Sequence, residues 1–319
     1  MHIPDGFLDA KTALATGAFS AAGLGLALRQ VRRDLPPRRV PLLGLAAAFL
    51  FAAQMVNFPV VGGTSGHLVG GALVAALLGP GAAVVVVATV LIVQCFLFAD
   101  GGVMALGANV FNMGLVATVS GYAIYRSAAR LLPGLQGRVA ALAFAGWCST
   151  VMAAAACAGQ LAWAGTVAWR VGFPAMTGVH ALIGLGEGVV SALVYVAVAR
   201  TRPDLLPDSP TSRTAPIHLR AFVVLGLLVT LGIALFVAPF ACPWPDGLDS
   251  VATRLGFAPK ALEPMLPALA ADYHLPGFTS PALATAAAGA VGALVVFGLA
   301  ILFSRLIVPK TAPDARDHA

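Results

Sequence analysis

Charged residues are scarce in this chain. Its 319 residues include 19 Lys and Arg and 13 Asp and Glu, so only 10% are charged, whereas 59% are hydrophobic. Soluble domains carry about 25% charged residues. This composition excludes an ordinary soluble globular domain, and it predicts a protein that crosses the lipid bilayer several times.

Cysteine is also sparse. The four cysteines are Cys95, Cys148, Cys157 and Cys242. No two of them have the CxxC spacing of a zinc or redox site, and three lie in apolar stretches. The sequence therefore indicates neither a disulfide framework nor a cysteine zinc site, and we interpret the four as small apolar residues.

Three signatures of enzymes are missing. The sequence has no GxxxxGK[ST] motif for ATP hydrolysis and no HExxH motif of a zinc protease. Ser65 stands near His67, but no acidic residue is close enough in sequence to orient the imidazole as in a catalytic triad. We therefore predict that the chain is not an enzyme.

Long apolar stretches are abundant instead. Nine of them are candidate membrane spans: 12–28, 41–57, 67–80, 82–98, 106–125, 139–162, 175–199, 219–240 and 281–304. The third is short and rich in Gly and Ala, which favours packing against other helices. The predicted fold class is an all-α polytopic membrane protein, with a seven-helix bundle followed by a two-helix transmembrane hairpin.

The basic residues are distributed asymmetrically. If the N-terminus lies outside, 15 of the 19 fall in inside segments, and the outside segments hold Lys11, Arg170, Arg254 and Lys260. The positive-inside rule then places the N-terminus outside and the C-terminus in the cytoplasm, in the cell (inner) membrane. Because these charges lie in short loops between spans, we expect no nucleic-acid partner.

A polar segment rich in Pro and Ser divides the chain. Within the second part, a short segment at 249–256 has the character of a helix. The predicted division is 1–200 for the bundle, 201–218 for a cytoplasmic linker, 219–305 for the hairpin with an extracytoplasmic loop at 241–280, and 306–319 for a cytoplasmic tail.

The first residues, MHIPDGF, carry a possible metal claw. The terminal amine, the amide nitrogen of His2 and Nδ1 of His2 can close on one ion, and the planar peptide keeps them nearly coplanar. A fourth nitrogen would complete the square that suits Ni(II) or Cu(II). No signal-peptide pattern is present, so we expect Met1 to keep its amine. The simpler alternative is that His2 belongs to a tail.

His67 is the candidate for the fourth nitrogen. It lies in a glycine-rich loop, residues 57–71, on the same predicted side as Met1. Neutral imidazole is a common metal ligand. The alternative is a packing or capping histidine, and His180 is the only other histidine near a predicted span.

Other polar side chains in the apolar region are candidates for a supporting shell or an ion pathway. We assign that role to Asn57, Ser65, Asn109 and Asn112. Asn109 and Asn112 are three residues apart, on one face of a helix, and hydrogen bonding between helices is the competing interpretation. Gln54, Gln94, Gln160 and Glu187 are also polar at membrane depth, and we assign Glu187 no catalytic role.

Three segments together resemble a known family. MHIPDGFL at 1–8, GTSGHLVGG at 63–71 and GANVFNMG at 107–114 are similar to the CbiM/NikM family, the substrate-specific (S) components of energy-coupling-factor transporters for cobalt and nickel. This resemblance covers residues 1 to about 200. Residues 219–304, with PDGLD at 245–249, resemble the two-helix NikN or PDGLE partner, although Asp249 replaces the usual Glu.

The resemblance implies a metal site and partners. The site would consist of the amine of Met1, the amide and imidazole nitrogens of His2, and the imidazole of His67. The substrate would be Ni(2+), with Co(2+) as the alternative, and Pro4-Asp5 is more similar to the nickel members. The partners would be a transmembrane coupling (T) protein and cytoplasmic ABC-type ATPases. A membrane metal sensor or loading module that does not transport is the other hypothesis.

The loop at 241–280 has no histidine cluster or paired carboxylates, and His274 is its only histidine. We therefore expect it to serve transport more than metal holding. It would steady the 58–66 segment or open that segment to admit an ion.

Overall fold

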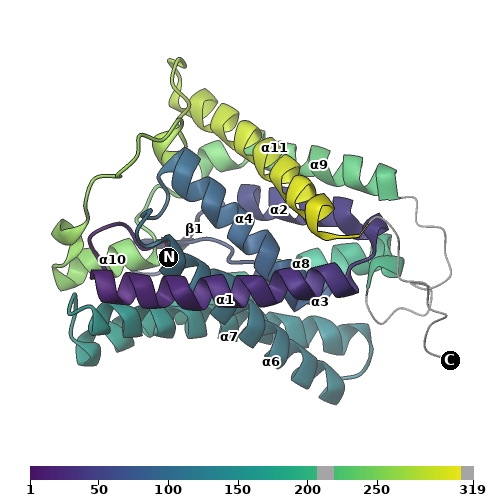
Figure 1. The fold of residues 1–319 in the computed structure, drawn as a ribbon, viewed down its shortest axis with the longest axis horizontal. Helices are drawn as coiled ribbons and strands as arrows, with labels where there is room; N and C mark the ends of the chain where they lie inside the picture. Colours follow the sequence, from purple (N-terminus) through teal and green to yellow (C-terminus); the bar gives the residue numbers. More distant parts are fainter. Residues whose placement is uncertain (207–218, 310–319) are drawn as a thin grey trace.

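The computed structural model describes residues 1–206 and 219–309, and it is almost entirely helical (Figure 1). The parts of the predicted linker and tail at 207–218 and 310–319 lie outside the described residues. The first part of the chain contains α1 (Ala10–Asp34), α2 (Val40–Gln54), α3 (Gly71–Leu78), α4 (Pro80–Phe98), α5 (Leu106–Asn109), the π-helical η2 (Val110–Ala117), α6 (Thr118–Leu131), α7 (Gly134–Trp163) and α8 (Trp169–Thr201). The second part contains α9 (Leu219–Phe236), α10 (Gly247–Leu255) and α11 (Pro281–Ile307).

The predicted all-α membrane fold is confirmed, and each of the nine predicted ranges contains a helix. Among the described residues, five helices are long and apolar enough to cross a bilayer: α4, α7, α8, α9 and α11. A sixth candidate is the run from α1 through η1 (Pro37–Arg39) to α2, which is bent by 116°. The chain is therefore a multi-pass membrane protein.

The prediction that residues 67–80 span the membrane is wrong. Only α3 is helical there, with eight residues, whereas a crossing needs about 20. Gly70 and Gly79 bound this helix with φ of 76° and 89°, a backbone that L side chains rarely adopt. His67 lies four residues before α3, in a stretch without regular secondary structure, within the loop noted in the sequence.

The hairpin packs on the bundle through α2. Both α9 and α11 contact α2, and α11 also contacts α4. Gly292 of α11 has no room for a side chain, because a Cβ there would collide with the rings of Phe51 and Phe98. Small residues at helix contacts allow the close approach that holds membrane helices together. The two parts of the chain therefore form one packed body in their described residues.

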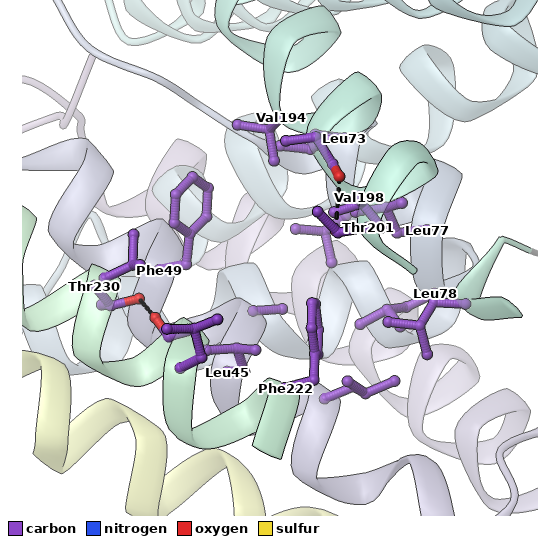
Figure 2. Close-up of a pocket in the computed structure, with 18 residues that line it drawn as sticks. Leu45, Phe49, Leu73, Leu77, Leu78, Val194, Val198, Thr201, Phe222 and Thr230 are labelled. Carbon is purple, nitrogen blue, oxygen red and sulfur yellow. Dashed lines mark hydrogen bonds between the residues drawn. The ribbon is translucent and has the colours of Figure 1, made fainter. Parts of the chain in front are cut away.

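An apolar cavity of about 350 Å³ lies between α2, α3, α8 and α9 (Figure 2). Leu45, Phe49, Val198 and Phe222 are among its lining side chains, and the hydroxyl of Thr230 donates to the Gly226 carbonyl of its own helix. These groups offer no ligand to a metal ion. The metal chemistry must be sought elsewhere in the structure.

The segment between α9 and α11 folds over one end of the bundle. It contains η5 (Ala238–Phe240), α10, η6 (Ala258–Lys260) and η7 (Ala271–Tyr273). α10 contacts α8 and lies close to the N-terminus, while α9 begins toward the opposite end (Figure 1). The helix expected at 249–256 is thus present as α10, and it stands beside the predicted metal claw.

Candidate metal centre

The N-terminal segment is bound into the protein and is not a free tail. The backbone of Ile3 is paired with the side chain of Asn109, which accepts from Ile3 N at 2.8 Å and donates to Ile3 O at 3.1 Å. Gly102 N also donates to Ile3 O, at 2.9 Å. Because Ile3 is fully buried and bonded on both sides, the two residues before it have a defined position.

The remainder of the MHIPDGF motif also helps to fix the position of Met1 and His2. The carboxylate of Asp5 accepts hydrogen bonds from the backbone N–H groups of Val103 and Met104, at 3.1 and 2.9 Å. Gly6 follows with a φ of 92°, and Phe7 is buried against Phe257, with 5.2 Å between the ring centroids. The turn at Asp5-Gly6 therefore directs Met1 and His2 back into the bundle.

His67 follows a short antiparallel pair, β1 (Phe58–Val60) and β2 (Thr64–Gly66). The backbone just after it is held by Glu187 of α8, whose carboxylate accepts from Val69 N at 2.6 Å and from Gly70 N at 2.9 Å. Nδ1 of His67 lies 3.1 Å from the carbonyl of Leu68 and donates to it in the tautomer protonated there. That tautomer leaves the Nε2 lone pair directed at the site.

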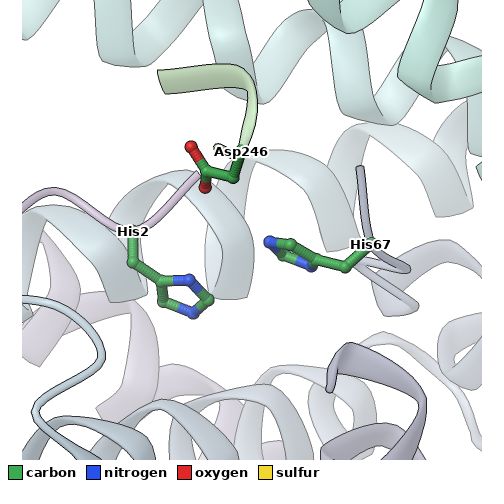
Figure 3. A group of neighbouring side chains, drawn as sticks. All are labelled: His2, His67 and Asp246. Atoms are coloured by element: carbon green, nitrogen blue, oxygen red, sulfur yellow. The ribbon is translucent and has the colours of Figure 1, made fainter. Parts of the chain in front are cut away.

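The amine of Met1 and the imidazole of His67 meet directly. Met1 N lies 3.1 Å from His67 Nε2, and both residues are buried. The rings of His2 and His67 are stacked, with 5.4 Å between their centroids. Figure 3 shows the two imidazoles facing the same space, with Asp246 beside them, and one ligand atom from each of these three side chains lies within 4.8 Å of the others.

The spacing between Met1 N and His67 Nε2 agrees with one edge of a square of nitrogens. In the claw the amine and Nδ1 of His2 occupy opposite corners, because the amide nitrogen lies between them in the chelate. His67 then occupies a corner next to the amine. With metal–nitrogen bonds of about 2 Å, adjacent nitrogens are about 2.8 Å apart. The observed 3.1 Å requires little adjustment.

The imidazole of His2 has an acceptor near each nitrogen. Nε2 lies 3.2 Å from Oε1 of Gln94, and Nδ1 lies 3.1 Å from Oδ1 of Asp100. Gln94 is itself oriented, because its amide nitrogen donates to Oε1 of Gln54 at 2.8 Å. The tautomer that donates from Nε2 to Gln94 leaves Nδ1 free to bind a metal. Binding in the predicted claw would therefore keep the Gln94 contact and give up the Asp100 contact.

Electrostatics distinguish the amine from the imidazoles. Burial works to lower the pKa of the Met1 amine, but the charge and hydrogen bond of Asp246 outweigh burial and raise this pKa above its ordinary value. Burial and the neighbouring ammonium lower the pKa of His67 to about 3, and burial also lowers the pKa of His2. Near neutral pH the imidazoles are thus unprotonated, and the amine carries the proton.

Asp246 lies beside the predicted site, and the sequence reasoning did not single it out. Its Oδ2 lies 2.5 Å from Met1 N, so the loop from the hairpin reaches the predicted metal site itself. The expectation that this loop serves transport more than metal holding stays a prediction, but the loop does contact one of the predicted ligands. The available signal was Asp246-Gly247 just before a helical segment, which marks an N-cap, and Asp246 does cap α10.

The same loop also contacts the 58–66 segment, as expected. Ser65 N donates to Pro245 O at 2.8 Å, and Ser65 Oγ donates to Trp244 O at 2.8 Å. Cys242 N donates to the backbone carbonyl of Asn57 at 2.9 Å. Asn57 and Ser65 therefore support the loop, and the structure does not place either side chain on the amine or on a predicted metal-ligating imidazole.

The other residues singled out from the sequence have different surroundings in the structure. Asn109 positions Ile3, whereas Asn112 pairs with Gln160 of α7 at 2.9 and 2.7 Å. His180 is buried in α8, with Nδ1 2.8 Å from the carbonyl of Met176, and Gly247 of the loop packs against it. His274 is bonded only locally, to Asp272 O.

Comparison with known proteins identifies a family for each of the two parts of the chain. Residues 2–205 match the family described as cobalt uptake substrate-specific transmembrane region, and residues 220–309 match the PDGLE domain. A putative fused nickel transport protein NikMN from Archaeoglobus fulgidus is 37% identical over 96% of this chain and 98% of its own length. A fused nickel transport protein NikMN from Rhodobacter capsulatus is 32% identical over 98% and 87%.

A solved structure, described as a truncated transition metal transporter, matches the first part of the chain. It is 34% identical, with a TM-score of 0.58, and covers 63% of this chain and 99% of its own. The chain belongs to the CbiM/NikM family of cobalt and nickel transport proteins, here fused to a PDGLE-type NikN partner.

Proposed function

We propose that this chain is the substrate-binding (S) component of an energy-coupling-factor importer that captures Ni(II), with Co(II) as the alternative. The carrying observation is the meeting of Met1 N and His67 Nε2 at 3.1 Å, beside a His2 held by the same N-terminal segment. The amine, the His2 amide and the two imidazoles would supply four nitrogens. On binding, the ion replaces a proton of the ammonium and the proton of the amide.

The transport assignment also has support beyond the site. Relatives that align over nearly the full chain are named fused nickel transport proteins, and a relative that aligns over 85% of it is named a cobalt transport protein. The distribution of basic residues favours an outside N-terminus, which turns the site toward the ion source. Since the chain lacks a P-loop, a transmembrane coupling protein and ABC-type ATPases would supply the energy.

The direct test is elemental analysis of the purified full chain after exposure to Ni(II) and Co(II). One tightly held ion per chain is the expected result. A metal sensor would also hold one ion. Uptake into cells or vesicles that contain the coupling protein and ATPases separates the two, because only a transporter component supports ATP-dependent accumulation.

His67→Ala is expected to weaken Ni(II) binding by more than about a hundredfold, beyond the 10–100-fold typical of residues that only support a ligand. His180→Ala is the matched control, since it removes another buried imidazole, whose Nδ1 lies by the Met176 carbonyl of its own helix. Titration calorimetry on both variants checks this. Equal losses, or a larger loss in His180→Ala, would mean that the fourth nitrogen has been misplaced.

Metal binding is expected to weaken as the pH falls. Since both imidazoles are already neutral near pH 7, the displaced protons come from the amine, whose pKa is raised, and from the amide. Each displaced proton costs about tenfold in affinity per pH unit, so two give about a hundredfold per unit below the pKa of the amine. Proton release measured with a pH electrode should be about two per ion, and release of none would contradict the proposed claw.

A further inference from the structure

The carboxylate of Asp246 is held at both oxygens. Oδ1 accepts from the backbone N–H of Asp249 at 2.9 Å and so caps α10, while Oδ2 faces the amine of Met1 at 2.5 Å. A side chain fixed by its own helix cannot turn away from the amine without uncapping that helix. The position of the Asp246 carboxylate beside the Met1 amine is therefore fixed.

The backbone that carries Asp246 is tied to the strand that leads to His67. Thr64 Oγ1 donates to the carbonyls of Pro245 and Asp246 at 3.1 and 3.2 Å, and Ser65 N donates to Pro245 O at 2.8 Å. His67 follows Ser65 by two residues. The relative positions of Asp246, His67 and Met1 are therefore set by one connected set of bonds, although Asp246 belongs to the fused hairpin.

Resting on the function proposed above, we propose that Asp246 is part of the metal site: it is the buried counter-charge that balances the ammonium when the site is empty and the ion when the site is filled. The hairpin would then complete the site, rather than only cover it. Asp246 acts here as a positioning and charge-balancing residue, and the four nitrogens remain the ligands.

The cost of burying a positive charge explains why the site requires a carboxylate. A positive charge removed from water is costly unless it is paired. Met1 is 3% exposed and His67 is 7% exposed, so an ion between them is largely out of water. Among the described residues, Asp246 is the acidic side chain that forms an ion pair with the amine. An ion bound at that nitrogen would lie beside the same carboxylate.

The test is Asp246→Asn in the full chain, with Asp249→Asn as the matched control. Asn is as good an N-cap as Asp, so the variant removes the charge and keeps α10 capped. Asp249 lies in the same turn, and its carboxylate is not bonded to the amine. We expect Asp246→Asn to weaken Ni(II) binding by about tenfold to a hundredfold. Asp249→Asn should change binding less than threefold, by about the scatter between variants of an exposed residue.

The ligand-field absorption of bound Ni(II) gives a second readout. It should be unchanged in Asp246→Asn, because the nitrogens stay, and altered in His67→Ala. Unchanged or tighter binding in Asp246→Asn, equal losses in both Asn variants, or a shifted absorption band would overturn the inference while leaving the proposed function standing. Failure of the unaltered chain to bind either metal would overturn both. Asp246→Ser, which also keeps a good N-cap, guards against a folding defect specific to Asn.

Discussion

One extra residue before Met1 is expected to abolish specific metal binding. The extension converts the primary amine into an amide, so the first nitrogen of the claw loses its lone pair and the chelate register shifts by one residue. The structure adds a steric reason. Met1 is 3% exposed and lies between His67 and Asp246, so a preceding residue has no place in the pocket. Titration calorimetry and elemental analysis of the intact extended chain, confirmed by mass, measure the effect.

The matched control for this experiment is a cleavable extension. Proteolytic removal that regenerates Met1 should restore full affinity and the original absorption spectrum in the same sample. The helices should remain, because their packing in the bundle does not depend on the amine. An extended chain that still binds Ni(II) with the same affinity and spectrum would show that the terminal amine is not a ligand.

The sequence predicted the part of the site that depends on local chemistry. The claw is contained in two consecutive residues, so its geometry follows from the planar peptide. The structure brings Met1, His2 and His67 together, as the proposed site requires. It also explains the neighbouring motif residues, since Ile3 and Asp5 are bonded to the 102–109 segment.

The side chains that contact the predicted ligands could not be predicted from the sequence, because each comes from a distant part of the chain. Asp246 reaches the amine across 245 positions, and the contact of Gln94 with His2 depends on how α4 packs beside the N-terminal segment. Apolar patterning specifies which stretches become helices. It does not specify which polar side chain at a helix end meets which, and this is also why α3 was mistaken for a span.

Glu187 shows how a buried acid can hold a loop in position. It lies in α8 and is fully buried, and both of its oxygens accept backbone hydrogen bonds from Val69 and Gly70. Those residues are the second and third after His67. The acid thus fixes the path of the loop that presents the imidazole, a role that is invisible from its place in an apolar sequence.

Removal of the hairpin is expected to nearly abolish uptake. The segment between α9 and α11 bonds to the N-terminal segment, where Leu262 N donates to Asp5 O at 2.8 Å. It also bonds to the turn after α4, where Tyr273 OH donates to Asp100 at 2.5 Å. Asp100 in turn faces Nδ1 of His2. A chain that ends at about residue 205 keeps the four nitrogens but loses all of these contacts, together with Asp246. It should bind Ni(II) at least as weakly as Asp246→Asn does.

Ion accumulation in vesicles with the coupling protein and ATPases measures the uptake. Supplying residues 219–304 as a separate chain should restore uptake only in part, because assembly then depends on encounter between two chains rather than on a covalent tether. Full uptake by the shortened chain would refute a transport role for the hairpin. If the shortened chain binds as tightly as the unaltered chain but transports nothing, the hairpin acts in transport alone. A shared weakening of binding and uptake is what we expect from a site completed by both parts of the chain.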